Sequence, residues 1–301
     1  MSLWVDTDFG FDDLWALLLL TRAGIAPAGI SLVAGNAPLG RVIANAQGAA
    51  AAYGIAAPLH AGADRPLLRA PETAGRILGP RGMPSRGRHL PDVGLPPPPA
   101  DAVAAMAAWL AEGDGPRTVL ALGPLTNIAL LLQRHPAAAA RITRLVWMGG
   151  SDGPGNHSPR AEFNALADPE AAALTAASGL PLDVVDLMFC RRATFGPADL
   201  PGTDPLTADL LGGYLDIGLS RGRPGMAIYD PVAALAVARP AAIGFAPVRM
   251  AVSTEPGESY GETRFAGDPA GPVRLARIAH DDIAAACLAA LETDPADGLS
   301  R

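Results

Sequence analysis

Lysine is absent from this sequence: all 23 basic side chains are arginines, against 30 aspartates and glutamates. The net charge of -7 and the pI near 5.2 provide no basic surface of the kind that binds nucleic acid. Continuous apolar runs fall short of the roughly 18 residues that a membrane-spanning helix needs. We therefore expect neither a nucleic-acid partner nor a membrane.

Cysteine is nearly absent as well. Cys190 and Cys287 lie far apart in the chain and form no metal-ligand spacing, so we interpret both as inert core residues. The N-terminal residues show no basic leader followed by an apolar segment, which argues against secretion. We therefore expect a reducing, cytoplasmic location.

What is present suits a large folded core. Half of the residues are apolar, only 5% are aromatic, and the chain has 34 glycines and 30 prolines. This balance argues against disorder. A length of 301 residues is enough for one large α/β domain or two small ones.

Short β-rich runs alternate along the chain with Ala/Leu-rich stretches of helical length. We expect strands at residues 3–6, 28–34, 57–61, 117–122, 143–148, 181–186, 247–253 and 273–279. We expect helices near 12–23, 39–53, 101–112, 124–134, 168–178, 207–220, 230–238 and 281–291. This alternation predicts an α/β fold with an open, mainly parallel central sheet flanked by helices on both faces. No linker-like composition divides the pattern, so we expect a single domain over residues 1–301.

Residues 79–100 are the exception to this pattern. The segment is rich in Gly, Pro and Arg and fits neither the helical nor the strand period. A loop of this length inside a compact domain is usually functional or disordered.

The stretch "LWVDTDFGFDDLW" at residues 3–15 places four aspartates behind the first expected strand: Asp6, Asp8, Asp12 and Asp13. Helix N-termini favour carboxylates, so capping can explain one or two of them. Four carboxylates repel one another unless a cation lies among them, and Ca²⁺ or Mg²⁺ prefers oxygen ligands of this kind. The stretch therefore indicates a metal site, with capping as the alternative.

Other polar residues stand where expected strands end or expected helices begin: Asn36, Asn127, Asn156, Glu162, Asn164 and Asp230. Because the carboxyl ends of parallel strands meet at one edge of a sheet, we expect these side chains on a common rim. Together they indicate a site for a small polyhydroxylated ligand. Each alone could be a turn or cap residue, which is the interpretation we favour for Asn127.

An apolar strand followed by D-x-D also opens the phosphatases of the haloacid dehalogenase type, in which the first aspartate is a nucleophile. Members of that family have Thr or Val two places after the second aspartate, where this chain has Gly10. They also have a basic residue, commonly lysine, that balances the charge of the phosphate, and in this chain only an arginine could replace it. The phosphatase is therefore the weaker alternative.

Taken together, the motifs resemble those of the inosine-uridine-preferring nucleoside hydrolases over most of the chain. "DTDFGFDD" is similar to their D-x-D-x-G-x-D-D signature, and it is followed in order by "VAGN", "ALGPLTNIAL", "VWMGG", "AEFN", "ADPEAA" and "YDPVAALAV". The resemblance implies a nucleoside hydrolase-like fold with a Rossmann-like core and a tightly bound Ca²⁺. It also implies hydrolysis of the N-glycosidic bond of ribonucleosides in purine or pyrimidine salvage, by a homodimer or homotetramer.

The resemblance assigns roles residue by residue. Asp8, Asp13 and Asp230 match the calcium ligands, and Leu122 matches a ligand that acts through its backbone carbonyl. Asp12 matches the residue that deprotonates the metal-bound water. The ribose-binding positions are matched by Asn36, Met148, Asn156, Glu162 and Asn164.

The implied chemistry has a physical basis. Cleavage of an N-glycosidic bond passes through an oxocarbenium-like state, which nearby carboxylates stabilise. Calcium can hold ribose hydroxyls and lower the pKa of a coordinated water, whose deprotonation Asp12 would complete.

The position before Asp230 departs from the family pattern. Many relatives have a histidine there, which is thought to assist the leaving base, whereas this chain has Tyr229. A phenol with a reference pKa of about 10 can donate a hydrogen bond, but it is a weaker acid than imidazolium. Tyr229 could also merely stack on the base. His89, in segment 79–100, could contact the base in its place or be a solvated loop residue.

Two functional hypotheses follow from this departure. The first is an active nucleoside N-ribohydrolase, and the second is a ribose- or nucleoside-binding protein with weakened catalysis. The intact acidic signature favours the enzyme, because a pure binding protein has little use for Asp12 as a base. The preferred base and the physiological substrate stay open.

Overall fold

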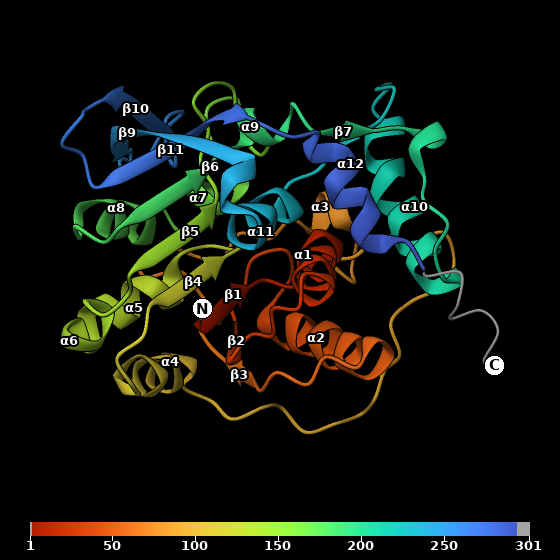
Figure 1. Ribbon diagram of the computed structural model, residues 1–301, viewed down its shortest axis with the longest axis horizontal. Coiled ribbons are helices and arrows are strands. Elements are labelled where there is room, and N and C mark those ends of the chain that lie inside the picture. The colour runs from red at the N-terminus through yellow and green to blue at the C-terminus, as the bar shows by residue number, and fades with distance from the viewer. Residues whose placement is uncertain (1, 294–301) are drawn as a thin grey trace.

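One sheet of nine strands forms the centre of the structure, a computed structural model that describes residues 2–293 (Figure 1). The strands are β1 (Ser2–Thr7), β2 (Gly29–Leu32), β3 (Leu59–Ala61), β4 (Arg117–Ala121), β5 (Arg144–Met148), β6 (Leu182–Val185), β9 (Ile243–Val252), β10 (Thr263–Gly267) and β11 (Val273–Ala279). Their spatial order is β10-β9-β11-β6-β5-β4-β1-β2-β3. A separate two-stranded sheet pairs β7 (Thr194–Phe195) with β8 (Met226–Ala227).

The large sheet is mainly parallel, which confirms the predicted fold class. Every neighbouring pair from β11 to β3 is parallel, and β9 runs antiparallel to both β11 and β10. β9 begins at Ile243, ahead of the predicted 247–253, and the sequence pattern does not predict β10, whose side chains are mostly exposed. The continuous sheet favours the single-domain interpretation, which stays a prediction.

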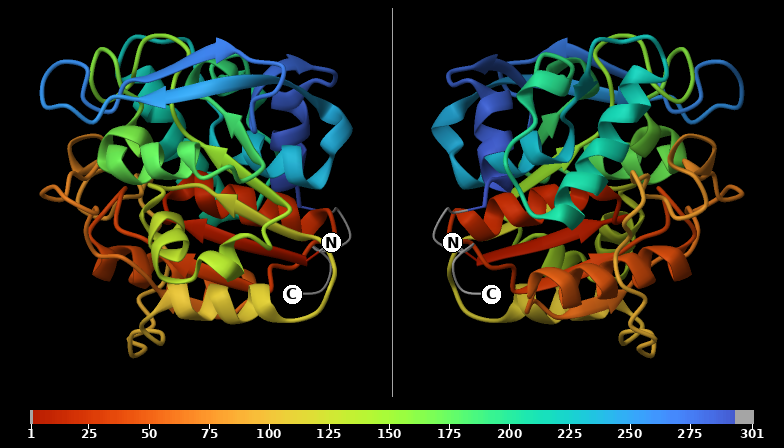
Figure 2. Two further views of the ribbon diagram at one scale, coloured as in Figure 1. Left: turned by 90° about the vertical axis from the view of Figure 1, so that its left-hand side faces the viewer. Right: turned by 90° about the vertical axis from the view of Figure 1, so that its right-hand side faces the viewer.

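Helices cover both faces of the sheet (Figure 2). One face carries α1 (Phe11–Arg22), α2 (Leu39–Tyr53), α10 (Pro205–Leu219), α11 (Asp230–Ala238) and α12 (Ile283–Leu288), and the other carries α4 (Ala102–Ala111), α5 (Thr126–Arg134), α6 (Pro136–Ala139) and α8 (Pro169–Ala177). Alternate strand residues enter the two cores: Leu3 and Val5 of β1 pack on the first face, and Trp4 packs on the second. Such strands are buried on both sides, which is why their sequences are almost continuously apolar.

All eight predicted helices are present, with ends shifted by a few residues, and the last one continues after α12 as a 3₁₀ turn. The sequence pattern does not predict α3 (Gly75–Leu78), α6, α7 (Phe163–Ala167) or α9 (Leu187–Cys190), because helices this short show no hydrophobic period. Within residues 2–293, no helix is long and apolar enough to cross a membrane. Both cysteines are free and buried in the core beneath α1 and α11.

Segment 79–100 contains no helix or strand, as the composition predicts. It lies across α2 and α10 and is fixed by specific contacts. Arg86 forms a two-point ion pair with Asp216 at 2.9 and 2.6 Å, and Gln47 Nε2 donates to the Pro96 carbonyl at 2.7 Å. A Cβ atom on Gly213 would lie 2.4 Å from the backbone of Ser85, so glycine at this position lets the segment rest on α10.

Candidate active site

A cavity of about 200 Å³ lies where β1, β2, β4 and β5 end at their carboxyl termini. It is lined by most of the site residues that the sequence predicts: Asp8, Asp12, Asn36, Leu122, Met148, Asn156, Glu162, Asn164, Tyr229 and Asp230. Asp13 is fully buried and adjoins this group, whereas His89 lies elsewhere. The parallel topology explains the convergence, because it brings the loops after the strands to one edge of the sheet.

Asp8 is held against the loop after β2. The backbone N–H of Asn36 donates to Asp8 Oδ2 at 2.7 Å, and Asn36 Nδ2 donates to Asp8 Oδ1 at 3.0 Å. A Cβ atom on Gly35 would lie 2.1 Å from the same carboxylate, so a larger residue would push it away. Two residues of the "VAGN" stretch therefore accommodate Asp8: Gly35 leaves space for the carboxylate, and Asn36 donates hydrogen bonds to it.

The two aspartates that open α1 have different surroundings. Asp13 accepts the Gly10 N–H at 2.7 Å and the Thr7 hydroxyl, so capping explains part of its role. Asp12 lines the cavity, and the Tyr214 hydroxyl from α10 lies 3.4 Å from its Oδ2. Asp13 therefore takes part in the cap of α1, whereas Asp12 is directed toward the cavity.

Asp6, the fourth aspartate of the signature, is a buried structural residue. Its Oδ1 accepts hydrogen bonds from the Ser31 hydroxyl and, at 2.7 Å, from Asn127 Nδ2. The Asn127 Oδ1 in turn accepts the Ala63 N–H at 2.9 Å. Asn127 thus ties β1 to the loop after β3, in line with the structural role that we favoured for it.

Asp230, at the start of α11, completes a compact acidic group. Single oxygens of Asp12, Asp13 and Asp230 lie within 4.8 Å of one another. Burial and repulsion by Asp13 raise the pKa of Asp12 to about 7, and burial raises that of Asp13 to about 6. Burial and the charges of neighbouring aspartates raise the pKa values of Asp230 and Asp8 well above the usual range.

This set of donors fits a hard divalent cation. Within residues 2–293, no arginine or histidine forms an ion pair with any of the four carboxylates that meet here. A cation among them would therefore remove an uncompensated repulsion. The compact group contains Asp12 in place of Asp8, so the ligand set Asp8, Asp13, Asp230 and the Leu122 carbonyl stays a prediction.

The ribose-binding positions expected from the resemblance also line the cavity. Glu162 caps α7 and accepts three backbone N–H groups, among them that of Asn164 at 2.9 Å. Burial raises the pKa of Glu162 to about 7, against the effect of these hydrogen bonds. Asn164 Nδ2 donates to the carbonyls of Leu122 and Met148 at 2.8 and 3.0 Å. The ends of β4 and β5 are thus tied to α7 directly beside the acidic cluster.

Tyr229 lines the cavity next to the acidic group. Burial raises the pKa of its phenol to about 12, although the charges of Arg191 and Arg223 act in the opposite direction. The hydroxyl therefore stays protonated at neutral pH and is a poor acid.

His89 does not line this cavity, so the structure does not support its interpretation as a base-contacting residue. Its ring is exposed, its Nδ1 lies 3.0 Å from the Ser85 hydroxyl, and it borders a separate small cavity beside α2. The ion pair of Arg86 with α10 holds this part of the segment over the outer surface of the helix layer. The alternative of a solvated loop histidine is the one that holds.

Comparison with known families identifies the group to which the chain is related. The sequence profile described as inosine-uridine preferring nucleoside hydrolase matches residues 3–295. The chain belongs to this nucleoside hydrolase family. Membership confirms the resemblance of the motifs and displaces the phosphatase alternative.

Individual nucleoside hydrolases match part of the chain. It is 40% identical over 197 residues to the non-specific ribonucleoside hydrolase RihC of Salmonella enteritidis, covering 64% of this chain and 63% of that protein. It is 38% identical over 198 residues to the pyrimidine-specific ribonucleoside hydrolase RihA of an Enterobacter species, covering 65% of this chain and 63% of that protein. The matched segments span 52% to 63% of the length of the curated relatives.

Solved structures of nucleoside hydrolases share the fold over nearly the whole length. A plant nucleoside hydrolase, PpNRh1, superposes with a TM-score of 0.88 at 22% identity, covering 97% of this chain and 99% of that one. A purine-preferring ribonucleoside hydrolase from Gardnerella vaginalis gives a TM-score of 0.86 at 21% identity, with the same coverage. This likeness confirms the nucleoside hydrolase-like fold.

Several residues that line the nucleoside hydrolase cavity are absent from our sequence-based predictions: Tyr214, His157, Phe163, Arg191, Arg221 and Arg223. His157 lies within the stretch "GNHSPRAEFN", between two predicted ribose-binding positions, so its place could have been inferred. Its Nε2 lies 3.0 Å from Glu72 Oε1. Tyr214 gives no such signal, because it stands 202 positions from the Asp12 that it contacts.

Proposed function

We propose that this protein hydrolyses the N-glycosidic bond of ribonucleosides and releases ribose and a nucleobase. The observation that carries the proposal is a cluster of four aspartates, three of them buried, beside a cavity that Asn156, Glu162 and Asn164 also line. Family membership and relatives that are named ribonucleoside hydrolases support it. The names of the relatives differ in base preference, so they support the reaction and leave the base open.

The proposal includes one resident Ca²⁺. Asp8, Asp13, Asp230 and the Leu122 carbonyl would hold it, and the acidic cluster supports a hard cation there. When bound, calcium supplies positive charge that orients ribose hydroxyls and makes a nearby water more acidic. We also propose a homodimer or homotetramer, which light scattering of the purified protein would test.

The side chains divide the work of the reaction. Asp12 accepts the proton of the water that attacks the anomeric carbon. The Tyr214 hydroxyl lies 3.4 Å from this carboxylate and donates its shorter hydrogen bond, at 3.0 Å, to the Ala227 carbonyl. Positive charge builds up on the sugar as the bond breaks, and the surrounding carboxylates stabilise it. Glu162, Asn164 and Asn156 bind hydroxyl groups of the ribose and fix its position. Tyr229 offers a hydrogen bond to the departing base.

A nucleoside panel scored for free ribose, with calcium and with a chelator, tests the proposal. We expect ribose release with calcium and its loss after chelation. The competing hypothesis is a nucleoside-binding protein with weakened catalysis, which the high pKa of Tyr229 favours. Binding of nucleosides in calorimetry without ribose release would support that hypothesis and contradict ours.

A further inference from the structure

The wall of the cavity carries charged side chains of both signs. Carboxylates gather where the strands end, whereas three arginines line other parts of the wall: Arg191, Arg221 and Arg223. Arg221 and Arg223 belong to the exposed segment between α10 and β8. Within residues 2–293, no carboxylate forms an ion pair with any of the three. The proposed reaction of a neutral nucleoside supplies no negative charge to pair with these arginines.

Arg191 is held in place by neutral groups. Its Nη1 donates to the Pro154 carbonyl at 3.3 Å, and its Nη2 donates to the Gly155 carbonyl at 3.0 Å. The side chain is half-buried at the cavity wall, so its charge is only partly screened by water. Carbonyl acceptors fix the guanidinium but do not cancel its charge.

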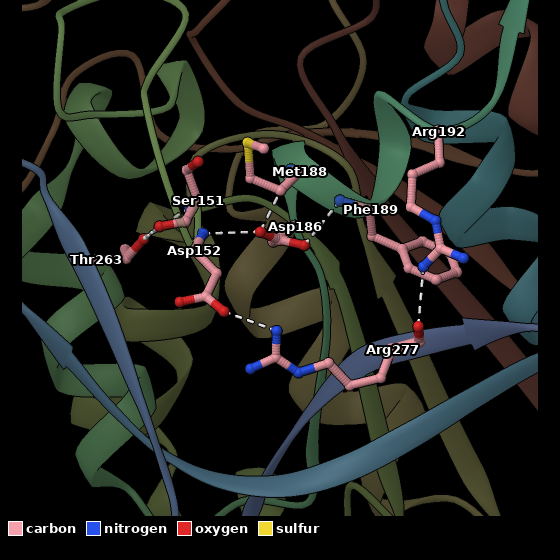
Figure 3. Close-up of polar contacts among 8 residues, drawn as sticks. All are labelled: Ser151, Asp152, Asp186, Met188, Phe189, Arg192, Thr263 and Arg277. Atoms are coloured by element: carbon pink, nitrogen blue, oxygen red, sulfur yellow. Dashed lines mark hydrogen bonds and ion pairs between the residues drawn. The ribbon is translucent and has the colours of Figure 1, made fainter.

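A polar network centred on Asp186 joins α9 to the loop after β5 (Figure 3). Asp186 caps α9, which directly precedes Arg191, and accepts the Phe189 N–H at 3.0 Å. The other carboxylate oxygen of Asp186 accepts the Asp152 N–H at 2.7 Å, and the side chain of Asp152 pairs with Arg277 at 2.6 Å. The network thus joins α9, the loop after β5 and strand β11.

Tyr229 lines the same cavity as the three arginines. Tyr229 is also the residue that the proposed function places at the leaving group. A negative charge on the substrate would therefore meet the arginines while the ribose occupies the acidic side.

We infer that Arg191, Arg221 and Arg223 bind an anionic group of the substrate, either a carboxylate on the base or a phosphate on the 5′ oxygen of the ribose. The inference rests on the proposed function and narrows its substrate class. Guanidinium groups bind both anions through paired, charge-assisted hydrogen bonds. An anionic riboside would thus be preferred to its neutral counterpart.

Two matched substrate pairs test this inference. The first is para-carboxyphenyl riboside against para-carbamoylphenyl riboside, and the second is uridine 5′-monophosphate against uridine. We expect the wild-type protein to show a kcat/KM ratio of at least about tenfold in favour of the anionic member of one pair. The pair that shows the preference identifies the source of the charge. Added salt should reduce the ratio, because the arginines at the rim are exposed to solvent.

The double variant Arg221→Gln/Arg223→Gln should lower the kcat/KM ratio of the anionic to the neutral substrate at least about tenfold, mainly by raising KM for the anionic substrate. Both positions are exposed, so folding is expected to be kept, and Arg191→Gln provides a second test. Arg192→Gln is the matched control: Arg192 is the next residue in the chain, but it donates to the Arg277 carbonyl at 2.8 Å and lies over the Phe189 ring (Figure 3). This control should keep the wild-type ratio.

Turnover of the neutral substrates separates the two proposals. If uridine or the carbamoyl compound is cleaved but neither pair shows an anionic preference, the inference is overturned and the proposed function stands. An anionic preference that survives in the double variant also overturns the inference. If none of the substrates releases ribose, the proposed function is overturned, and the inference is overturned with it.

Discussion

Asp12 and Asp8 lie close together, yet their expected roles differ. Asp12 lines the cavity beside the Tyr214 hydroxyl, whereas Asp8 is bound by the backbone and side chain of Asn36. We expect Asp12→Asn to lower kcat at least ~10²-fold, as is typical for the loss of a general base, while calcium stays bound. Steady-state kinetics and elemental analysis of the purified variant check both parts.

Asp8→Asn is the comparison for this prediction. As a predicted ligand, Asp8 should be needed for calcium binding, so this variant should contain less metal than Asp12→Asn. The opposite result would assign Asp12 to the metal, in line with its place in the compact group with Asp13 and Asp230. A near-normal kcat for Asp12→Asn would remove this residue from the mechanism.

Tyr229 limits how well the leaving base can be protonated. Its pKa is raised to about 12, so at neutral pH it gives up a proton less readily than an imidazolium would. We expect para-nitrophenyl riboside, which needs little assistance, to be cleaved far better than inosine or uridine. Tyr229→His should narrow this gap by at least about tenfold. The measurement is the ratio of kcat/KM values for the two kinds of substrate.

His157 and His89 provide the controls for the Tyr229 prediction. His157 lines the cavity and pairs with Glu72, whereas His89 lies outside it. If natural nucleosides and the activated riboside turn over equally well in the wild type, Tyr229 is not the limitation. His157→Ala should then lower turnover of the natural nucleosides selectively, and His89→Ala should leave both substrates unaffected.

At the scale of single elements, the cap of α7 links stability to pH. Glu162 has its pKa raised by burial to about 7, above its usual value of 4.5. The folded state therefore binds this proton more tightly than the unfolded state does. The contribution of Glu162 to the free energy of unfolding is fully present below about pH 4.5 and is lost as the pH rises to about 7.

Glu162→Gln should flatten this part of the pH profile, because the amide keeps its size but does not titrate. We expect the Tm of the chelator-treated wild type to fall more steeply between about pH 5 and pH 7 than the Tm of the variant. Differential scanning fluorimetry over this range provides the measurement. Glu258→Gln, at an exposed position, should follow the wild-type profile. Equal slopes for all three proteins would contradict the prediction.

Across the molecule as a whole, calcium should tie the N-terminal residues to α11. Asp8 and Asp13 stand near the start of the sequence and Asp230 opens α11, and α1 packs against α11. We expect calcium at 100 times its Kd to add about 2.7 kcal/mol to the free energy of unfolding, visible as a rise in Tm. The rise should be larger at pH 8 than at pH 5, because raised carboxylate pKa values make protons compete with the metal.

Thermal scans with calcium and with a chelator at the two pH values measure this effect. Magnesium at the same concentration serves as the comparison cation, and the smaller ion should stabilise the protein less. Exhaustively dialysed protein that holds no divalent ion by elemental analysis, and that shows no shift with calcium, would rule out the site.

Local patterns in the sequence were enough to predict the features that each element encodes on its own. The alternation of strand and helix defined the parallel sheet and its two helical layers, since each element carries its own hydrophobic period. Parallel topology then placed Asp8, Asn36 and Asp230 at one edge of the sheet without any knowledge of their contacts. The acidic signature indicated a metal site because carboxylates this close in sequence also lie close together in space.

The contacts between residues that are distant in the sequence became known from the folded structure. The contact of Tyr214 with Asp12 and the arginines on the wall depend on how α10 and the segment after it pack on the sheet. His89 lies outside the cavity because Arg86 ties its segment to Asp216, a contact across 130 positions. Side-chain contacts of this kind have no sequence period and no fixed spacing. They result from the packing of complete elements, which no local stretch of sequence encodes.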